Sequence, residues 1–300
     1  MKHIFFLAAA AFLLFACQKE LSRSAPVKTG PVSLAQFFTK NAVPVYLFTA
    51  ASENSIRLTT PKGTGVQFPE NAFVTSGNRP VTGPVSIEVK EIFTPGEMIL
   101  NNTPAMSDGK PLISGGEFFV RVTQGSEVLK LAPGKHIRLN VVPPAGADMQ
   151  GMQVFNGDTS SGTINWIPNN NPGNTVARDT IRFSVILFAD SLQWLNIDKF
   201  IDEPKIRYTV LPGNCPDLDS TAVFVHLTGQ KSVFRFPGGA SGLTSDNMIA
   251  ARATLVGICV VDGKIHHSVV PVNMQNGGVA TLAFTPIEEA ALKQKLAALE

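Results

Sequence analysis

The residues of this sequence that could act as catalytic groups do not form a known catalytic motif by their spacing, so an enzyme site would have to converge from distant loops. Ser241 follows Gly239 as in a nucleophile elbow, but Leu243 stands where the G-x-S-x-G motif needs its second glycine. Glu88 and Glu91 are three positions apart in a segment that alternates like a strand. Their side chains therefore point to opposite faces and cannot form a glycosidase pair by themselves. The sequence predicts a protein that is not an enzyme.

The residues that could bind a metal ion are equally dispersed. His266 and His267 are adjacent within a predicted strand, so their side chains point to opposite faces and cannot bind one ion. Asp217 and Asp219 could begin a Ca²⁺ loop, but the downstream glutamate that would bind the ion through two oxygens is missing. We favour a loop in which these carboxylates cap backbone amides. We expect no metal and no other cofactor.

The start of the chain has the pattern of an export signal. Lys2 and His3 precede the apolar run Ile4 to Ala16, whose thirteen residues are too few to span a bilayer, which needs about 20. The run ends in Leu-Phe-Ala-Cys at residues 14–17, which resembles the lipobox of bacterial lipoproteins. The alternative is a buried N-terminal element with an incidental cysteine. The resemblance implies a signal peptide over 1–16 and fatty acylation of Cys17.

Lipidation of Cys17 would place the protein at a membrane. Several acyl chains on one cysteine give lasting attachment, whereas a single chain binds only marginally. Residues 17–32 are polar, contain Pro and Gly, and are expected to form a flexible tether with a reach of about 20 Å. Gln18 is not the aspartate that retains such proteins in the inner membrane, so we expect an exported protein anchored at the outer membrane. Both the periplasmic side and the cell-surface side of that membrane are compatible with the sequence.

The amino-acid composition narrows the classes of partner that this protein could bind. Only 16% of the residues are charged and the net charge is +2. The sequence therefore lacks the concentration of positive charge that nucleic-acid binding needs. The chain has 20 Phe but only 2 Trp and 2 Tyr, a balance that favours core filling over exposed stacking platforms. Apart from Cys17, the cysteines are Cys215 and Cys259. In an oxidising compartment we favour a disulfide between them over a buried free thiol at Cys259.

The pattern of short alternating segments predicts an all-β protein with two β-sandwich-like regions. Ser33 and Gln36 have the form of a capping box that opens a short N-terminal helix. Seven strand-like segments follow and predict a sandwich over 33–148, then a connecting β region over 149–205. A second sandwich-like region is expected over 206–300. It contains an Asp262-Gly263 hairpin turn and ends in an amphipathic helix that begins after Thr285.

Three stretches of the first region carry a family resemblance. The segments GTGVQFPENAF (63–73), PVTGPVSIEVKEI (80–92) and SGGEFFVRV (114–122) resemble the ZU-five β-sandwich domain over about residues 43–145. They look closer still to a group of exported lipoproteins of Bacteroidota. The resemblance implies a scaffolding or interaction domain, although likeness of fold alone does not transfer function.

Two functions follow from these patterns. The leading hypothesis is a membrane-anchored envelope lipoprotein that acts as a non-enzymatic structural or protein-interaction module, with an envelope protein as partner. The alternative is a glycan-binding accessory lipoprotein of an uptake system, which needs two of the four Trp and Tyr residues exposed in one groove. A candidate ligand contact is Trp194, Asn196 and Asp198, although a buried Trp beside turn-bonding polar residues is favoured.

Overall fold

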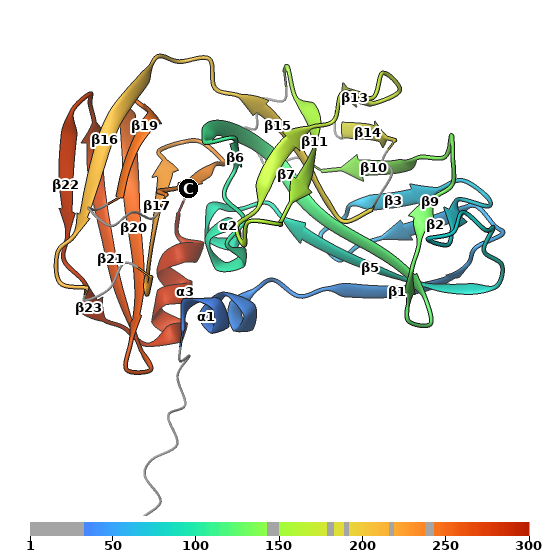
Figure 1. Cartoon of the computed structure of the whole chain (residues 1–300), viewed down its shortest axis with the longest axis horizontal. Coiled ribbons are helices and arrows are strands. Elements are labelled where there is room, and N and C mark those ends of the chain that lie inside the picture. Colours follow the sequence, from blue (N-terminus) through green and yellow to red (C-terminus); the bar gives the residue numbers. More distant parts are fainter. Residues whose placement is uncertain are drawn as a thin grey trace, which may run out of the picture.

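The protein consists of two β-sandwiches and three short helices (Figure 1). The computed structural model describes residues 33–142, 150–178, 183–188, 192–215, 219–237 and 243–299. The predicted signal peptide over 1–16 and the tether over 17–32, with Cys17, lie outside the described residues. No helix in the described ranges has the length and apolar character to cross a membrane. The strand-rich architecture confirms the prediction of an all-β fold with two sandwich-like regions.

The first sandwich is built from two sheets that share one core. Side chains such as Ile87 and Phe118 from the larger sheet meet Phe68 and Leu139 from the smaller one, and all four are almost completely buried. The larger sheet contains, in spatial order, β1 (Tyr46–Ala51), β5 (Pro84–Ile92), β7 (Lys110–Gln124), β15 (Trp194–Phe200), β11 (Gln153–Asp158) and β12 (Asn165–Pro168), with β6 (Met106–Ser107) and β8 (Glu127–Val128) attached to β7. The smaller sheet contains β13 (Thr175–Arg178), β14 (Phe183–Leu187), β10 (Ile137–Val141), β3 (Gly65–Phe68) and β2 (Ile56–Thr59), and beside it β4 (Phe73–Val74) pairs with β9 (Lys130–Leu131).

The segment expected to be a connecting β region over 149–205 supplies strands to both sheets of this sandwich. Strand β15 lies between β7 and β11, and its Trp194 pairs with Phe119 of β7. Strand β14 completes the ladder of β10, with Leu139 opposite Val185. Leu195 and Ile197 are buried in the same core as Phe118. The sequence pattern alone does not reveal this, because alternation shows that a segment is a strand without showing which strand it joins.

The second sandwich packs a three-stranded sheet against a five-stranded one. Their shared core contains Tyr208, Val223 and Leu255. In the hairpin between β20 (Ala251–Val261) and β21 (Lys264–Met274), Asp262 and Gly263 both have positive φ, as a type I′ turn requires, which confirms the predicted turn. The smaller sheet has the order β19 (Leu243–Ile249), β16 (Lys205–Pro212), β22 (Gly278–Leu282), and the larger has the order β18 (Val233–Arg235), β17 (Thr221–Leu227), β20 (Ala251–Val261), β21 (Lys264–Met274), β23 (Thr285–Pro286).

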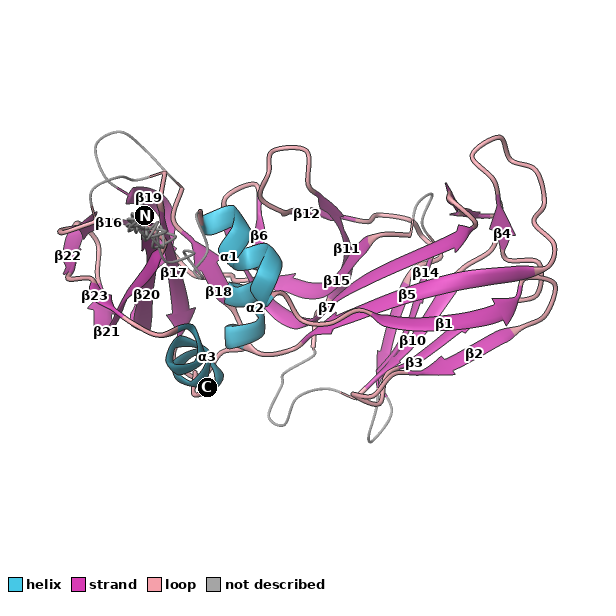
Figure 2. Cartoon of the chain, turned by 90° about the horizontal axis from the view of Figure 1, so that it is seen from below, coloured by secondary structure: helices cyan, strands magenta, loops and turns pink. Residues whose placement is uncertain are grey.

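Three helices cover the outer face of the five-stranded sheet (Figure 2). They are α1 (Leu34–Asn41), α2 (Pro95–Asn101) and α3 (Glu289–Ala297). Phe37 of α1 and Leu292 of α3 share a cluster with Phe224 and Ile258 of the sheet, so α1 packs on the second sandwich although it precedes the first in sequence. Strand β17 is therefore buried along its whole length, since one face meets the sandwich core and the other meets the helices.

The sequence predicts the start of helix α1 correctly but not the start of helix α3. The Ser33 hydroxyl accepts a hydrogen bond from the Gln36 amide, which confirms Ser33 as the N-cap of α1. The expected start of the C-terminal helix at Thr285 is wrong. Thr285 and Pro286 form β23 against His266 and His267, and α3 begins only at Glu289. Pairing with the free edge of β21 takes these two residues out of the helix.

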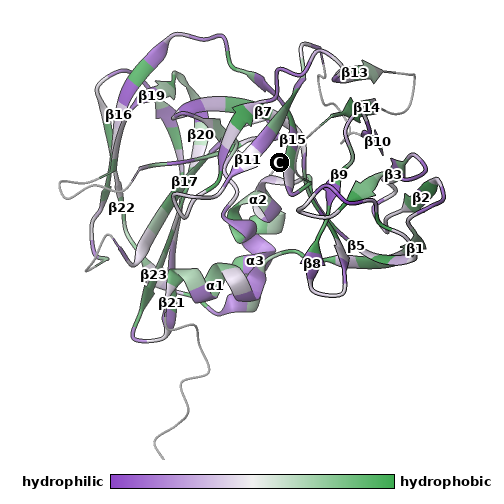
Figure 3. Ribbon diagram, turned by 45° about the vertical axis from the view of Figure 1, so that its right-hand side comes forward, coloured by the Kyte–Doolittle hydropathy of each residue, from purple (hydrophilic) through white to green (hydrophobic). Residues whose placement is uncertain are grey.

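Figure 3 shows the alternation of hydrophobic and hydrophilic residues along the strands of both sandwiches.

Candidate functional site

The predicted ligand-contact residues lie on β15, and two of the three are buried. Asn196 and Asp198 are fully buried, and a bulge in the β15–β7 pairing separates them. Trp194 is partly exposed and packs against Phe119 and Trp166. Because solvent does not reach Asn196 or Asp198, the three residues do not form a surface groove. Asp198 nevertheless lies close to a second buried acid, which is on the neighbouring strand β7.

That second acid is Glu117, which lies opposite Asn196 in the β7–β15 pairing and is also fully buried. The Asn196 amide donates a hydrogen bond of 2.7 Å to Asp198 and accepts one of 3.3 Å from the Ser114 hydroxyl. Neither carboxyl oxygen of Glu117 has a hydrogen-bond partner in the described chain. The Thr103 hydroxyl is close enough to favour the charged form of Glu117 but lies outside hydrogen-bonding geometry.

Burial sets the charge of this acidic pair. It raises the pKa of the Glu117 carboxyl well above its usual range, and the nearby Asp198 raises it further. Burial likewise raises the pKa of Asp198, against the lowering effects of the nearby Ser114 hydroxyl and of the hydrogen bond from Asn196. Both carboxyls therefore favour the protonated form. No group of three or more His, Cys, Asp or Glu residues with the geometry of a metal site occurs among the described residues.

The other residues that the sequence singled out are dispersed. Glu88 forms an ion pair with Arg121 at 2.6 Å on the outer face of β5, whereas Glu91 is buried. The Nδ1 atom of His267 lies 3.3 Å from the Thr285 carbonyl oxygen. Asp217 and Ser241 lie outside the described residues. The described members of this set therefore do not converge on a common site.

A disulfide joins Cys215 to Cys259 across the second sandwich. Their Cα atoms are 6.5 Å apart, within the usual range for such a bond, and the bridge ties the loop before β17 to the C-terminal part of β20. Cys259 is fully buried in the sandwich core. The bond therefore connects a surface loop to one of the most buried strands of the molecule.

The aromatic residues that a glycan site would need are packed in the protein. Trp166 is fully buried and donates its indole N–H to the Pro104 carbonyl at 3.1 Å. Tyr208 is 4% exposed in the second core. Trp194 and Tyr46 are partly exposed but lie on strands β15 and β1, which two further strands separate. The four side chains do not form one exposed groove.

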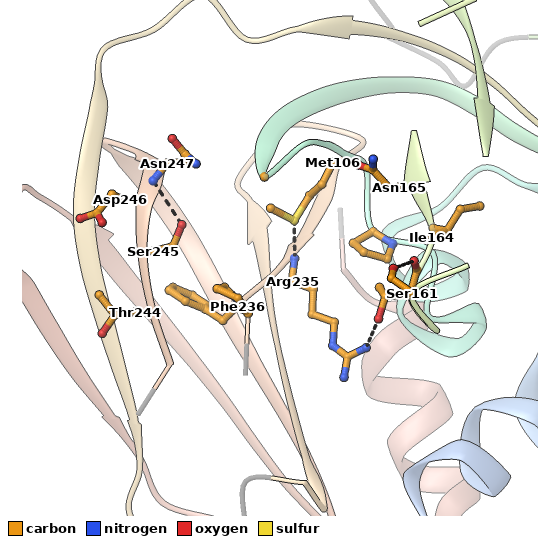
Figure 4. Close-up of a pocket in the computed structure, with 14 residues that line it drawn as sticks. Met106, Ser161, Ile164, Asn165, Arg235, Phe236, Thr244, Ser245, Asp246 and Asn247 are labelled. Atoms are coloured by element: carbon orange, nitrogen blue, oxygen red, sulfur yellow. Dashed lines mark hydrogen bonds between the residues drawn. The ribbon is translucent and has the colours of Figure 1, made fainter. Parts of the chain in front are cut away.

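A cavity at the junction of the two sandwiches is a site that no sequence motif indicates (Figure 4). Its volume is about 560 Å³, which falls within the usual range for small-molecule sites. The first sandwich contributes the loop before β6 and the β11–β12 hairpin, and the second contributes β18, β19 and the residues after β18. The lining combines apolar side chains with hydroxyls and amides: Met106, Ile164 and Phe236 with Ser161, Thr163, Asn165, Ser245 and Asn247.

Arg235 is the one cation among the residues that line this cavity in the described chain. Its backbone N–H donates to the sulfur of Met106, and its side chain runs on toward Thr163 (Figure 4). The Nη1 atom donates to Asn102 Oδ1 at 2.9 Å and to Thr163 Oγ1 at 3.3 Å. The guanidinium also lies 5.8 Å from the centre of the Phe224 ring. Sequence reasoning missed Arg235 because a lone arginine in a three-residue strand forms no motif.

No protein-family model matches this chain, and no curated protein matches it. The likeness to ZU-five domains and to exported lipoproteins of Bacteroidota therefore remains an expectation from the sequence.

Proposed function

We propose that this protein is an exported lipoprotein of the bacterial envelope, anchored to the outer membrane through Cys17, that acts as a structural or protein-interaction module. The observation that supports export most directly is the Cys215–Cys259 disulfide. Structural disulfides persist in oxidising compartments and are rare in the cytosol of most organisms. The lipobox-like residues 14–17 add the anchor, and the polar residues 17–32 add the tether.

A binding role is supported by how the two sandwiches are joined. Strand β7 of the first sandwich is tied to the second by the buried hydroxyl of Ser232, which donates to the Leu112 carbonyl at 2.6 Å. Helix α1 packs on the second sandwich, and the chain continues from it into β1 of the first. These contacts join the two sandwiches through buried groups, and a joined pair of domains suits a module that presents surfaces to partners.

The absence of enzymatic activity stays part of the proposal. The acids with the most strongly raised pKa values, Glu117 and Asp198, are fully buried, so a substrate cannot reach them in this conformation. A general acid or base must lie within hydrogen-bonding distance of the group that it protonates. The glycan-binding alternative gains no support from the packed Trp166 and Tyr208.

The anchor is tested by replacing Cys17 with alanine in cells grown with a clickable palmitate analogue. We expect Cys17→Ala to lose the lipid label and to give unprocessed or soluble protein that a carbonate wash removes from membranes, because the apolar run over residues 4–16 is too short to span a bilayer. The matched control is Cys215→Ala, which removes a cysteine but should keep both the label and the membrane fraction. Retention of the Cys17→Ala protein on membranes after a carbonate wash contradicts the assignment.

The interaction role is tested by photo-crosslinking in intact cells. Leu47 is 70% exposed on β1, the edge strand of the larger sheet, where an unpaired edge can receive a strand from another protein. A photoreactive amino acid at Leu47 should give a discrete crosslinked protein band, whereas one at the exposed turn residue Gly77 should not. Protease treatment of the same cells distinguishes the surface face from the periplasmic one.

A further inference from the structure

We propose that the cavity at the junction of the two sandwiches binds a small organic carboxylate with an apolar portion, held through its charge by Arg235. This site is independent of the lipid anchor, so it stands or falls separately from the proposed envelope role. Three features of the site support this assignment: the hydrogen bonds of Arg235, its charge balance and the mixed lining of the cavity.

The first step is the set of donors that Arg235 leaves unused. A guanidinium has five N–H donors in a fixed fork. Nη1 is occupied by Asn102 and Thr163, whereas Nε and Nη2 have no hydrogen-bond partner in the described part of the chain. Neither nitrogen is buried without a partner, so both remain accessible. Nε and Nη2 form the edge of arginine that binds both oxygens of a carboxylate in parallel.

The second step is the charge of Arg235. Arginine stays protonated under physiological conditions, and burial lowers its pKa because desolvation penalises the charged form. Its protein partners in the described ranges are all neutral: an amide oxygen, a hydroxyl and an aromatic ring. The carboxylate of Asp246, which also lines the cavity, is 70% exposed and pairs with Arg207 at 3.2 Å. An anionic ligand would therefore supply the counter-charge that the protein does not.

The third step is the remainder of the lining. Met106, Ile164 and Phe236 offer apolar surface, and Ser161, Asn165 and Asn247 offer hydroxyl and amide groups around it. This combination suits the carboxyl end of a short peptide, which has an apolar side chain, backbone amides and a terminal carboxylate. A sugar acid fits less well, because it lacks the apolar side chain and neither Trp nor Tyr lines the cavity.

The experiment measures binding of N-acetyl-alanyl-leucine to the purified full chain by ligand-observed NMR and calorimetry. The matched probes are its C-terminal amide, which removes the charge, and methyl glucuronide, which keeps the carboxylate on a sugar. We expect the free acid to bind at least about 10-fold more tightly than the amide, since a hydrogen bond to a charged group changes affinity by about 10- to 100-fold.

The variants locate the site. Arg235→Gln removes the charge while leaving a polar amide side chain on β18, and it should weaken binding of the acid by about 10-fold or more. Arg252→Gln removes a positive charge from an exposed position of β20 away from the cavity and should leave binding unchanged. If Arg235→Gln unfolds, Ser161→Trp provides the second test. This exposed rim position should accept the larger ring, and the ring should block the cavity.

The outcomes separate the proposal from its alternatives. Equal binding of acid and amide, or binding unchanged in both Arg235→Gln and Ser161→Trp, overturns the role of Arg235. Binding of the glucuronide alone overturns the choice of a peptide-like carboxylate. Absence of binding by every probe at about 10 mM overturns the site itself, because even a weak specific complex is half-formed at that concentration. None of these results changes the expected behaviour of Cys17→Ala.

Discussion

Ser232 of the second sandwich and Ser114 of the first are joined by a buried hydrogen bond, in which the Ser114 amide donates to the Ser232 hydroxyl at 3.1 Å. The same hydroxyl donates to the Leu112 carbonyl at 2.6 Å, so one side chain satisfies two backbone groups of β7. The two serines are 118 positions apart in sequence. This contact fixes β7, which carries Glu117, against the second sandwich.

Ser232→Ala should therefore lower the free energy of unfolding by about 1–3 kcal/mol, because it leaves a buried amide and a buried carbonyl without partners. Chemical denaturation followed by far-UV circular dichroism measures the change. Ser55→Ala, at an exposed position before β2, is the matched control and should change the value by less than about 0.5 kcal/mol. An equal effect of the two substitutions would mean that Ser232 does not join the sandwiches.

The buried Glu117 should make stability fall as pH rises. Its pKa in the folded protein is raised above the ordinary value of 4.5, so above that pH the folded state binds more protons than the unfolded state. The stability that the protonated carboxyl contributes is fully present below pH 4.5 and is lost as pH rises through the folded-state pKa. The loss is at most about 1.4 kcal/mol per pH unit for one group.

Glu117→Gln removes this titration while keeping the shape of the side chain. We expect the variant to be more stable than the natural protein at pH 7 and its stability to depend less on pH above 4.5. Urea unfolding at a series of pH values measures both effects. Glu70→Gln, at an exposed position, serves as the control and should follow the natural curve. A Glu117→Gln protein that is less stable at pH 7 would show that the ionised carboxylate is required.

Gly96 of α2 should not tolerate even alanine. Alanine normally stabilises a helix relative to glycine, but a Cβ at Gly96 would overlap the backbone carbonyl of Leu296 in α3, 2.8 Å from its carbon. We expect Gly96→Ala to lower the unfolding free energy by about 1–3 kcal/mol through overpacking. Gly77→Ala is the control, since its Cβ would lie 3.8 Å from the nearest side chain. Thermal unfolding of both variants measures the difference.

Loss of the disulfide should destabilise the second sandwich. The bond closes a loop with a sequence separation of 44, and removing such a bond lowers stability by about 2–4 kcal/mol. We expect Cys215→Ala to unfold at lower denaturant concentration than the oxidised protein and to be insensitive to reductant. Alkylation and intact-mass measurement check the premise, because Cys215 and Cys259 should accept label only after reduction. Labelling of both before reduction would contradict it.

Local structure was predictable from the sequence where it depends on neighbouring residues. The alternation in residues 85–92 and 117–122 reflects the side-chain period of a strand, and both segments lie within strands β5 and β7. Ser33 as an N-cap and Asp262-Gly263 as a turn depend only on the conformational preferences of those residues. Thr285 shows the limit, because a capping signal yielded to strand pairing with His267.

Only the tertiary structure decided which segments come together. A strand pattern does not specify its partner, so the sequence could not place β15 between β7 and β11 or pack α1 on the second sandwich. Whether an ionisable side chain is buried depends equally on which segments of the chain pack around it. Burial raises the pKa of Glu117, which lies opposite Asn196 in the pairing of β7 with β15, and Arg235 became the cation of a cavity because two sandwiches meet there. The sequence by itself determined the strands, the turn and the cysteines available for pairing, since these are set by local chemistry, whereas the candidate site depends on contacts between residues more than a hundred positions apart.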